Sequence, residues 1–440
     1  MVSISKLSVV MCIAIALLTV RVQAAPQAKP ADLVLTPGTY DVTWSLPDEN
    51  IMGRGASGLC DFNGEIGNQV KGKPEFKSEK PKYGQIVFDY DAARDGGNKI
   101  VGILVALDES GGTGKGYDTL YVDVNRNLDL SDDAKTSWKD GSGQSYSKFV
   151  IQLPYKELVG GNVSGLAALD FTLYSSNEQA PYCYFTIRGC IAGQIDSNQG
   201  KIPFSAFDTN ANGVFGDVWK LTEKSSISGD MLQLRLDTKA EDSLVFGSGD
   251  FYWNKALNVA GKLYTFKMNP SGDKLEVARY NGPTAQLMFV AEPISKVKTS
   301  VAGVMIGGQQ GMYSVSNPTK PFIVPPGSYH FYLVMLQATL AKDQKLMARV
   351  QPDAKREIAV KEGKKGTAKF GGKIKMVIRS AAAEILLTPG KDQKIDLSIT
   401  FPNGDSFGGL YRQDGKNPET KVVLKYPKGK IIDQQKAGFG

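Results

Sequence analysis

Short runs of β-branched and aromatic residues recur along the whole chain, and each run is bounded by Gly, Pro, Asn or Asp. The 48 Gly and 21 Pro residues supply turns throughout, whereas apolar residues at helical spacing are scarce. Strand-length runs separated by such turn residues are typical of antiparallel sheets. We therefore predict a mainly β protein. The clearest strands are expected at residues 99–107, 120–124, 182–187, 231–236, 262–268 and 285–290.

The first residues have the layout of a cleavable secretory signal. A single cation, Lys6, precedes an apolar run over residues 7–20, and Val22, Gln23 and Ala24 then form a cleavage site. The run is too short for a membrane-spanning helix, and no other stretch reaches the roughly 20 apolar residues that cross a bilayer. We expect residues 1–24 to be removed after Ala24. The mature protein is expected to be secreted or periplasmic, without a transmembrane segment.

Composition divides the remaining chain into two β regions. Residues 301–440 hold 22 Lys and Arg against 11 Asp and Glu, whereas the rest of the chain holds 30 against 34. The stretch 307–326 is rich in Gly, Gln, Ser, Asn and Pro, coincides with this change, and is predicted to be a linker. We expect an N-terminal β region over residues 25–306, formed by one domain or two, and a basic C-terminal β-sandwich over residues 327–440.

The basic region has lysines at alternate positions of strand patterns such as residues 373–376. This spacing is typical of solvent-facing positions on half-buried strands, so nucleic acid is not an expected partner. Attraction to an acidic surface polymer is an alternative interpretation of the same charge.

The residue pattern of the C-terminal region predicts helices at residues 337–346 and 380–387, and strands at residues 329–336, 357–360, 373–378, 394–400, 421–426 and 430–432.

Two segments carry Asp and Asn at the same spacing. Each begins with Asp, has Asn two and four residues later, an apolar residue at plus seven and Asp at plus nine. We name residues 123–133 loop 1 and residues 208–217 loop 2; their starts lie 85 residues apart, which suggests an internal repeat. The apolar residues, Leu130 and Phe215, are expected to anchor the loops. The candidate metal ligands are Asp123, Asn125, Asn127, Asp129, Asp132 and Asp133 in loop 1 and Asp208, Asn210, Asn212 and Asp217 in loop 2.

Both loops resemble the D-x-[DN]-x-[DN] calcium loops of EF-hand-like and dockerin-like modules. Ca²⁺ takes six to eight oxygen ligands, and a tight loop with acids or amides at alternate positions turns successive side chains toward one point. The resemblance implies a structural calcium ion that neutralises clustered carboxylates and fixes a strand connection. The alternative is that Asp and Asn serve only as turn formers, because their side chains bond the backbone two residues on.

The two loops depart from the EF-hand pattern at position twelve. Ala134 and Trp219 stand where a bidentate Glu is usual, so a closing carboxylate would come from Asp132, from Asp217 or from elsewhere. Loop 1 holds four carboxylates and loop 2 holds two. This difference predicts tighter calcium binding at loop 1.

A wider resemblance covers most of residues 35–440. The segments 117–123, 259–264, 324–329 and 425–432 resemble uncharacterised secreted bacterial proteins in which such loops precede a C-terminal β-sandwich. The resemblance implies export, calcium loops, and a sandwich of the immunoglobulin-like or carboxypeptidase-regulatory-like type. It implies no known activity.

Three cysteines, Cys60, Cys183 and Cys190, follow the signal segment, so at most one pair can close within the mature chain. Export favours oxidation. Cys183 and Cys190 bracket a strand-like run and a turn, and they are the predicted disulfide. Three reduced, buried thiols are the alternative.

The residue set argues against most enzyme classes. The single histidine, His330, lies in an alternating strand pattern, which excludes a zinc site built on two or three histidines. No catalytic or cofactor-binding set is predicted, and a binding or structural protein stabilised by calcium is expected. The first alternative is a carbohydrate-binding protein or a glycoside hydrolase with paired carboxylates. The second is an adhesion module for acidic envelope polymers, and a cell-envelope or extracellular polysaccharide would be the partner.

Overall fold

The computed structural model of the chain is mainly β, which confirms the predicted fold class: 60% of the described residues lie in strands and 2% in helices. The predicted signal segment, residues 1–24, and the helix expected at residues 380–387 lie outside the described residues. Within those residues no helix is long and apolar enough to cross a membrane. The structure describes residues 33–46, 57–62, 68–87, 102–112, 117–125, 127–137, 146–156, 162–174, 182–210, 212–221, 226–227, 229–236, 250–294, 297–339, 345–353, 355–373, 375–379, 396–412, 420–425 and 431–437.

One large antiparallel sheet forms the centre of the first part of the chain. Its strands, in the order of their hydrogen bonding, are β15 (Asp250–Tyr252), β14 (Met231–Leu234), β11 (Gly200–Phe207), β10 (Cys190–Ser197), β1 (Gly38–Ser45), β18 (Lys274–Arg279), β17 (Lys262–Met268) and β16 (Leu257–Val259). Strand β1 pairs directly with β10, with Val42 opposite Gly193. The segment 57–188 therefore leaves the sheet after β1 and returns to it at β10.

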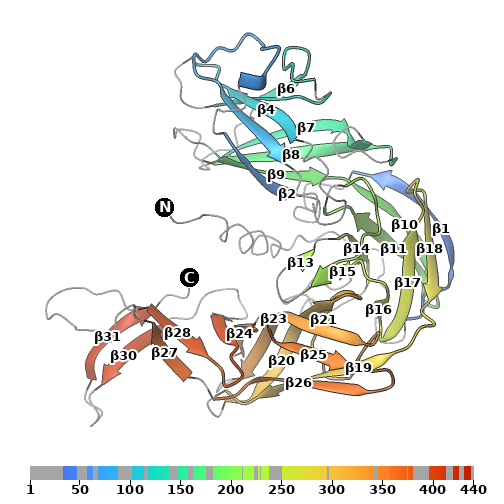
Figure 1. The fold of residues 1–440 in the computed structure, drawn as a ribbon, viewed down its shortest axis with the longest axis vertical. Helices are drawn as coiled ribbons and strands as arrows, with labels where there is room; N and C mark the ends of the chain where they lie inside the picture. Colours follow the sequence, from blue (N-terminus) through green and yellow to red (C-terminus); the bar gives the residue numbers. More distant parts are fainter. Residues whose placement is uncertain are drawn as a thin grey trace.

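This inserted segment forms two further antiparallel sheets, which Figure 1 shows in blue to green at the top of the molecule. One sheet has the order β2 (Ser57–Asp61), β9 (Tyr182–Arg188), β8 (Leu166–Tyr174) and β7 (Tyr146–Pro154). The other has the order β3 (Lys82–Val87), β4 (Gly102–Asp108), β5 (Thr119–Val122) and β6 (Ala134–Ser137). A short hairpin, β12 (Lys220–Leu221) and β13 (Ser226–Ile227), follows loop 2.

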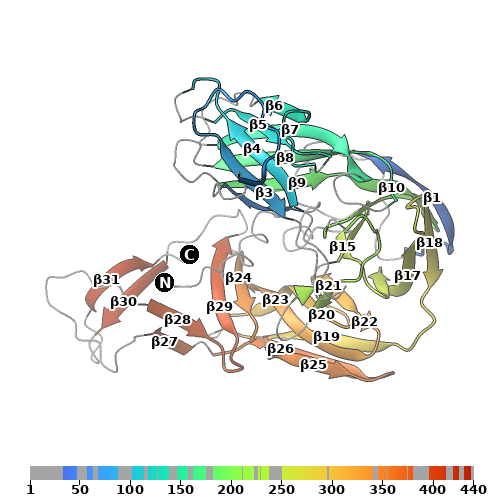
Figure 2. The same cartoon turned by 45° about the horizontal axis from the view of Figure 1, so that its top comes forward.

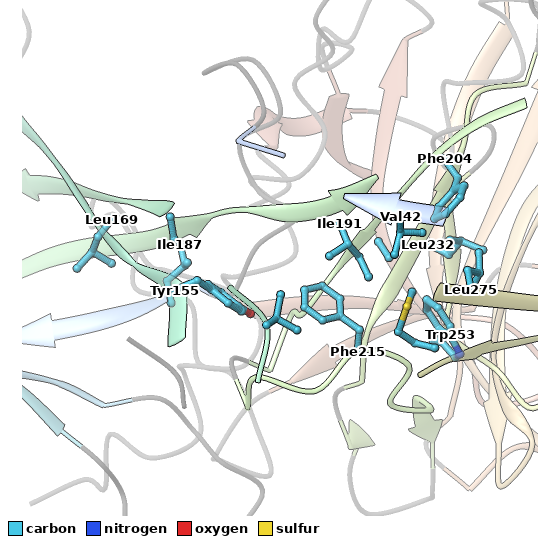
Figure 3. Packing of buried hydrophobic residues seen from close by; sticks show 14 of the residues in the cluster. Val42, Tyr155, Leu169, Ile187, Ile191, Phe204, Phe215, Leu232, Trp253 and Leu275 are labelled. Atoms are coloured by element: carbon cyan, nitrogen blue, oxygen red, sulfur yellow. The ribbon is translucent and has the colours of Figure 1, made fainter. Parts of the chain in front are cut away.

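A continuous hydrophobic core joins these sheets. Figure 3 shows it running from Leu169 and Ile187 through Tyr155 and Phe215 to Trp253, so side chains of the inserted segment and of the large sheet pack together. Strand β4 is buried on both faces because its residues alternate between this core and a smaller cluster. The smaller cluster consists of Tyr83, Leu104, Ala106, Tyr121 and Leu130.

Residues from 285 onward form a second group of sheets, drawn from yellow to red in Figure 2. A small sheet has the order β22 (Phe322–Val324), β19 (Ala285–Glu292) and β26 (Lys365–Gly371), with β19 parallel to β26. A larger antiparallel sheet has the order β21 (Gly311–Ser316), β20 (Thr299–Gly308), β23 (Gly327–Thr339), β24 (Lys345–Gln351), β29 (Ser406–Arg412), β28 (Asp396–Thr400) and β27 (Lys375–Arg379), and β25 (Glu357–Val360) pairs with β23. Strands β30 (Thr420–Lys425) and β31 (Ile431–Ala437) form a hairpin.

The second core draws residues from both of these sheets. Leu287 and Phe289 of β19 belong to it, and Phe331 of β23 packs against Phe370 of β26 with ring centroids 5.3 Å apart. The helix predicted at residues 337–346 is wrong in its described part, because residues 337–339 end β23 and residues 345–346 begin β24.

The linker predicted at residues 307–326 is also wrong. The end of β20, all of β21 and all of β22 lie in this stretch, and Met312 and Tyr313 are buried. Its glycines allow a tight hairpin instead. Gly311 has a φ of 131°, a backbone angle that residues other than glycine rarely adopt. The second core already includes Ala285, so the change of core falls between β18 and β19. The expected domain limits, residues 25–306 and 327–440, shift accordingly.

Polar contacts connect the two cores. The Asn254 amide donates to the Met312 carbonyl at 2.8 Å and accepts the Met312 N–H at 2.7 Å, so a side chain completes the backbone bonding of β21. Tyr313 donates to the Ala256 carbonyl at 3.0 Å, and Asn258 donates to the main chain of β22 at 2.8 Å. These bonds satisfy buried polar groups at the junction, which would otherwise be costly.

Candidate metal centre

Both loops occupy the same place in a sheet. Each follows an inner strand and precedes the strand that pairs with it: the last residue of β5 lies opposite Ala134, the first of β6, and the last residue of β11 lies opposite Met231, the first of β14. The residues just before the returning strands are Asp133 and Asp230. Each of them therefore faces the first Asp of its loop across the start of a β ladder.

The apolar residue at plus seven anchors each loop, as the sequence predicted. Leu130 is 1% exposed and belongs to the smaller cluster with Tyr121. Phe215 is 6% exposed and lies in the large core, with its ring centroid 6.2 Å from that of Tyr155. Each loop is thus fixed at its middle by burial of a large side chain, which contributes about 1.5–3 kcal/mol.

The first Asp holds the turn of each loop in the same way. One carboxylate oxygen accepts the N–H at plus four and the other accepts the N–H at plus five. These distances are 3.2 and 3.0 Å for Asp123, and 3.2 and 2.7 Å for Asp208. The residue at plus five has a positive φ in both loops, 66° at Leu128 and 74° at Gly213. Glycine adopts this conformation freely, whereas leucine does so at a cost of about 1–2 kcal/mol.

The two Asn side chains of each loop converge on the Asp at plus nine. In loop 1 the amide nitrogens at plus two and plus four lie 3.3 and 3.0 Å from Asp132 Oδ2. In loop 2 Asn210 Nδ2 lies 3.1 Å from Asp217 Oδ2, and Asn212 donates to the same oxygen. The geometry of the two loops therefore repeats in its side chains as well as in its spacing.

A closing carboxylate completes each loop. Asp133 accepts the N–H of Val124 at 3.1 Å, and Asp230 accepts the N–H of Thr209 at 3.3 Å. Both donors stand at plus one of their loop. Sequence spacing missed Asp230, because the β12–β13 hairpin separates it from loop 2. Asp230 lies directly before β14, as Asp133 lies directly before β6. This matching position would have identified Asp230 from the sequence.

Each loop gathers buried negative charge. Burial raises the pKa of Asp133 to about 6, and the carboxylates of Asp123 and Asp132 contribute to the rise. In loop 2 burial raises the pKa of Asp208 to about 6. Burial, and after it the charge of Asp208, holds the pKa of Asp230 well above its usual range. No described Lys, Arg or His forms an ion pair with Asp133, Asp208 or Asp230.

The turn-forming role of these residues is also present. Asp129 N–H donates to Asn127 Oδ1 at 2.6 Å, and Val214 N–H donates to Asn212 Oδ1 at 2.9 Å, which are bonds from a side chain to the backbone two residues on. Asp129 accepts the N–H of Ser131 at 2.9 Å and its hydroxyl at 2.5 Å. Its carboxylate thus bonds to Ser131 and not to the Asn side chains of the loop.

Among the described residues of the loops, Asp133 Oδ2 and Asn210 Oδ1 are buried without a hydrogen-bond partner. Among the described residues no three His, Cys, Asp or Glu side chains form a ready-made metal-binding group. A cation would therefore depend on amide and main-chain oxygens beside the carboxylates, which is the donor set that Ca²⁺ prefers. The Asn side chains of the loops turn their NH₂ groups toward the Asp at plus nine, while the oxygens of Asn127 and Asn212 accept main-chain N–H groups. An amide oxygen could therefore reach a cation only if the side chain turned and gave up its bond to the main chain.

The predicted Cys183–Cys190 disulfide is wrong, because one strand separates the two cysteines. Residues 182–188 form one continuous strand, β9, and a strand rises about 3.3 Å per residue. The two Cα atoms are therefore on the order of 20 Å apart, whereas a disulfide needs roughly 7 Å or less. The turn expected near Gly189 does not reverse the chain.

A separate cavity of about 390 Å³ lies between β25 and β26. Its two carboxylates lie beside basic side chains: a Glu292 oxygen is 3.8 Å from Lys369 Nζ, and a Glu357 oxygen is 3.8 Å from His330 Nε2. The polar residues that line the cavity are Glu292, Arg356, Glu357, Thr367, Lys369 and Asn403.

No protein-family model, no curated protein and no solved structure matches the chain significantly. The expected similarity to secreted bacterial proteins therefore stays a prediction.

Proposed function

We propose that the protein is exported and stabilised by calcium, and that it serves as a binding or structural module whose two loops each hold one Ca²⁺ ion. The observation that carries the proposal is the repeated geometry: at each loop a first Asp, an Asp at plus nine and a closing Asp lie near enough for their charges to act on one another, beside two Asn side chains. Hydrogen bonds of the turn engage these carboxyl groups, but no described basic side chain forms an ion pair with Asp133, Asp208 or Asp230.

In loop 1 we assign the ligands to Asp123, Asp132 and Asp133, with oxygen atoms from Asn125 and Asn127. Asp129 is left out of this set because its carboxylate is bonded to Ser131. In loop 2 the corresponding ligands are Asp208, Asn210, Asn212, Asp217 and Asp230. The advantage expected for loop 1 from its carboxylate count thus disappears, since each set has three.

Calcium would stabilise the fold by neutralising the buried carboxylates and by tying the end of one strand to the start of its neighbour. Binding to the folded state alone contributes about 2.7 kcal/mol per site when the calcium concentration is 100 times Kd. Weak sites suffice outside the cell, where Kd values of roughly 10⁻⁴–10⁻³ M are typical. The ions are therefore expected to be structural.

Substitution of the Asp at plus nine tests this function. Asn in place of Asp132 or Asp217 keeps an oxygen that accepts from the neighbouring amides, so stability in a chelator should change little. The stabilisation by calcium should decrease for each variant, and it should be lost in the double variant. The measurement is the melting temperature with calcium and with chelator.

Asp129→Asn is the matched control, because it makes the same chemical change in loop 1 at a carboxylate outside the proposed ligand set. It should retain the full response to calcium. If the protein itself shows no calcium response, or if Asp129→Asn loses as much of it as Asp132→Asn, the assignment fails.

The cavity between β25 and β26 supports a second candidate, carbohydrate binding or glycoside hydrolysis, because two carboxylates line one space. Glycoside hydrolases use such a pair as acid and as nucleophile or base. A panel of chromogenic glycosides and a glycan array would test it. Any activity or binding should be lost in Glu292→Gln and Glu357→Gln but retained in Glu362→Gln, which changes an exposed turn residue outside the cavity. A blank result in both assays counts against this candidate.

A further inference from the structure

Two cysteines lie directly opposite each other on neighbouring strands. Strands β2 and β9 are antiparallel, and their register places Cys60 opposite Cys183. Opposed residues in such a pair have Cα atoms about 4.5–5.5 Å apart. Disulfides bridge Cα separations of about 4.4–6.8 Å. The backbone therefore brings these two cysteines within disulfide reach.

The third cysteine is excluded from this pairing. Cys190 begins β10, in a different sheet, and burial raises the pKa of its thiol to about 11. The thiolate is the reactive form in disulfide exchange, so Cys190 is a poor nucleophile. An odd number of cysteines in the mature chain then has a simple arrangement, with one pair and one inert thiol.

We propose that Cys60 and Cys183 form a cross-strand disulfide under oxidising conditions. The bond joins β2 and β9, the first and last strands of the inserted segment 57–188. It therefore links the two ends of the segment that contains loop 1. In the structure Cys60 is a free, buried thiol in the large core. The crosslink would add a covalent bond to the antiparallel pairing of β2 with β9. The proposal depends on the proposed export only for the place where oxidation occurs.

The reaction needs an external disulfide of the glutathione or thiol oxidoreductase class. One cysteine thiolate attacks it, a mixed disulfide forms, and one external thiolate leaves. The second cysteine thiolate then attacks the protein sulfur of the mixed disulfide and displaces the second external thiolate. Two protein thiols are oxidised, one external disulfide is reduced to two thiols, and the two cysteine protons pass to the released thiolates.

The experiment refolds the reduced protein in a glutathione redox buffer that contains a chelator, so the result does not depend on calcium. Peptide mass mapping without reductant identifies the linked cysteines. The expected product is the Cys60–Cys183 peptide, formed in the protein and in Cys190→Ser but absent from Cys60→Ser and Cys183→Ser. The melting temperature of the oxidised protein should exceed that of the reduced protein by on the order of 5–10 °C.

Other products would overturn the proposal. A dominant Cys183–Cys190 or Cys60–Cys190 peptide would contradict the strand register, and retention of free thiols at Cys60 and Cys183 in fully oxidised glutathione would show that the pair cannot close. Because Cys190→Ser retains the pair, a variant that folds poorly at Cys60 or Cys183 does not remove the test. Loss of calcium binding in a separate titration would leave this result unaffected.

Discussion

Replacement of Asp230 by Ala should destabilise loop 2 although residue 230 lies outside the loop in the sequence. Asp230 is fully buried and accepts three main-chain N–H groups, from Thr209 at 3.3 Å, Gly216 at 2.6 Å and Asp217 at 2.8 Å. Each buried donor left without an acceptor costs about 1–3 kcal/mol. We therefore expect Asp230→Ala to lower the free energy of unfolding by at least about 3 kcal/mol when calcium is present.

The loss should be smaller in a chelator. Without a cation, burial and the neighbouring carboxylates disfavour the charged form of Asp230, so removing this charge relieves part of the cost. With calcium bound, the carboxylate would be a ligand and its removal would also forfeit the stabilisation at that site, about 2.7 kcal/mol at 100 times Kd. The difference between the losses in the two conditions thus measures how much of the stabilisation by Asp230 depends on bound calcium.

Urea denaturation with calcium and with chelator would measure both values. Asp196→Ala is the control, because its exposed carboxylate forms a surface ion pair with Lys201, at 2.8 Å, and such pairs contribute about 0–1 kcal/mol. Equal losses for Asp230→Ala in the two conditions would refute its role as a ligand. A loss as small as that of the control would refute its role in closing the loop.

Three further predictions concern pH, the anchor and the junction of the cores. In chelator the free energy of unfolding should fall as pH rises from roughly 4 to 6 and above. The reason is that the native carboxyl of Asp208, with its pKa raised to about 6, keeps a proton that the unfolded chain has released. Calcium should flatten this pH profile, and urea midpoints that rise with pH in chelator would contradict the prediction. Phe215→Ala should cost about 3–5 kcal/mol in urea denaturation, whereas the control Val214→Ala, at a side chain 53% exposed, should cost less than about 0.5 kcal/mol. Asn254→Ala should lower the free energy of unfolding by about 2–5 kcal/mol, because it leaves the N–H and carbonyl of Met312 unpaired at the junction of the cores. Calorimetry should then show separate unfolding transitions for the two cores, and one unchanged transition would contradict this.

The sequence predicted the strands well because they are short, alternating and bounded by turn residues. The strand at residues 262–268 is observed with the predicted ends, and that at residues 357–360 likewise. The order of the strands in the sheets could not be predicted. Strand β1 pairs with β10 across the whole inserted segment, and this pairing depends on shared burial, which local pattern does not encode.

The errors have physical causes that can be named. Glycine and proline between residues 307 and 326 suggested a linker, but a tight β-hairpin needs the same residues at its turns. A strand also keeps its direction unless a turn reverses it, and spacing alone could not show that Gly189 joins two strands of different sheets. The predicted pairing of Cys183 with Cys190 depended on that reversal.

The candidate centre was predicted in part. Asp and Asn at fixed spacing are local, so the loops and their anchors Leu130 and Phe215 were found from sequence. The closing residue of loop 2 was not, because Asp230 reaches the loop only through the pairing of β14 with β11. Asp129, at plus six of loop 1, was a candidate ligand, but its carboxylate is bonded to Ser131. Which side chains converge is a property of the sheet and not of the spacing.

Calorimetric titration of calcium into the chelator-treated protein tests the central claim most directly. The account predicts two binding sites per chain, one lost in Asp132→Asn and the other in Asp217→Asn, with a melting temperature that rises as the sites fill. Absence of binding heat together with an unchanged melting temperature would contradict it, and both loops would then be turns built from Asp and Asn alone.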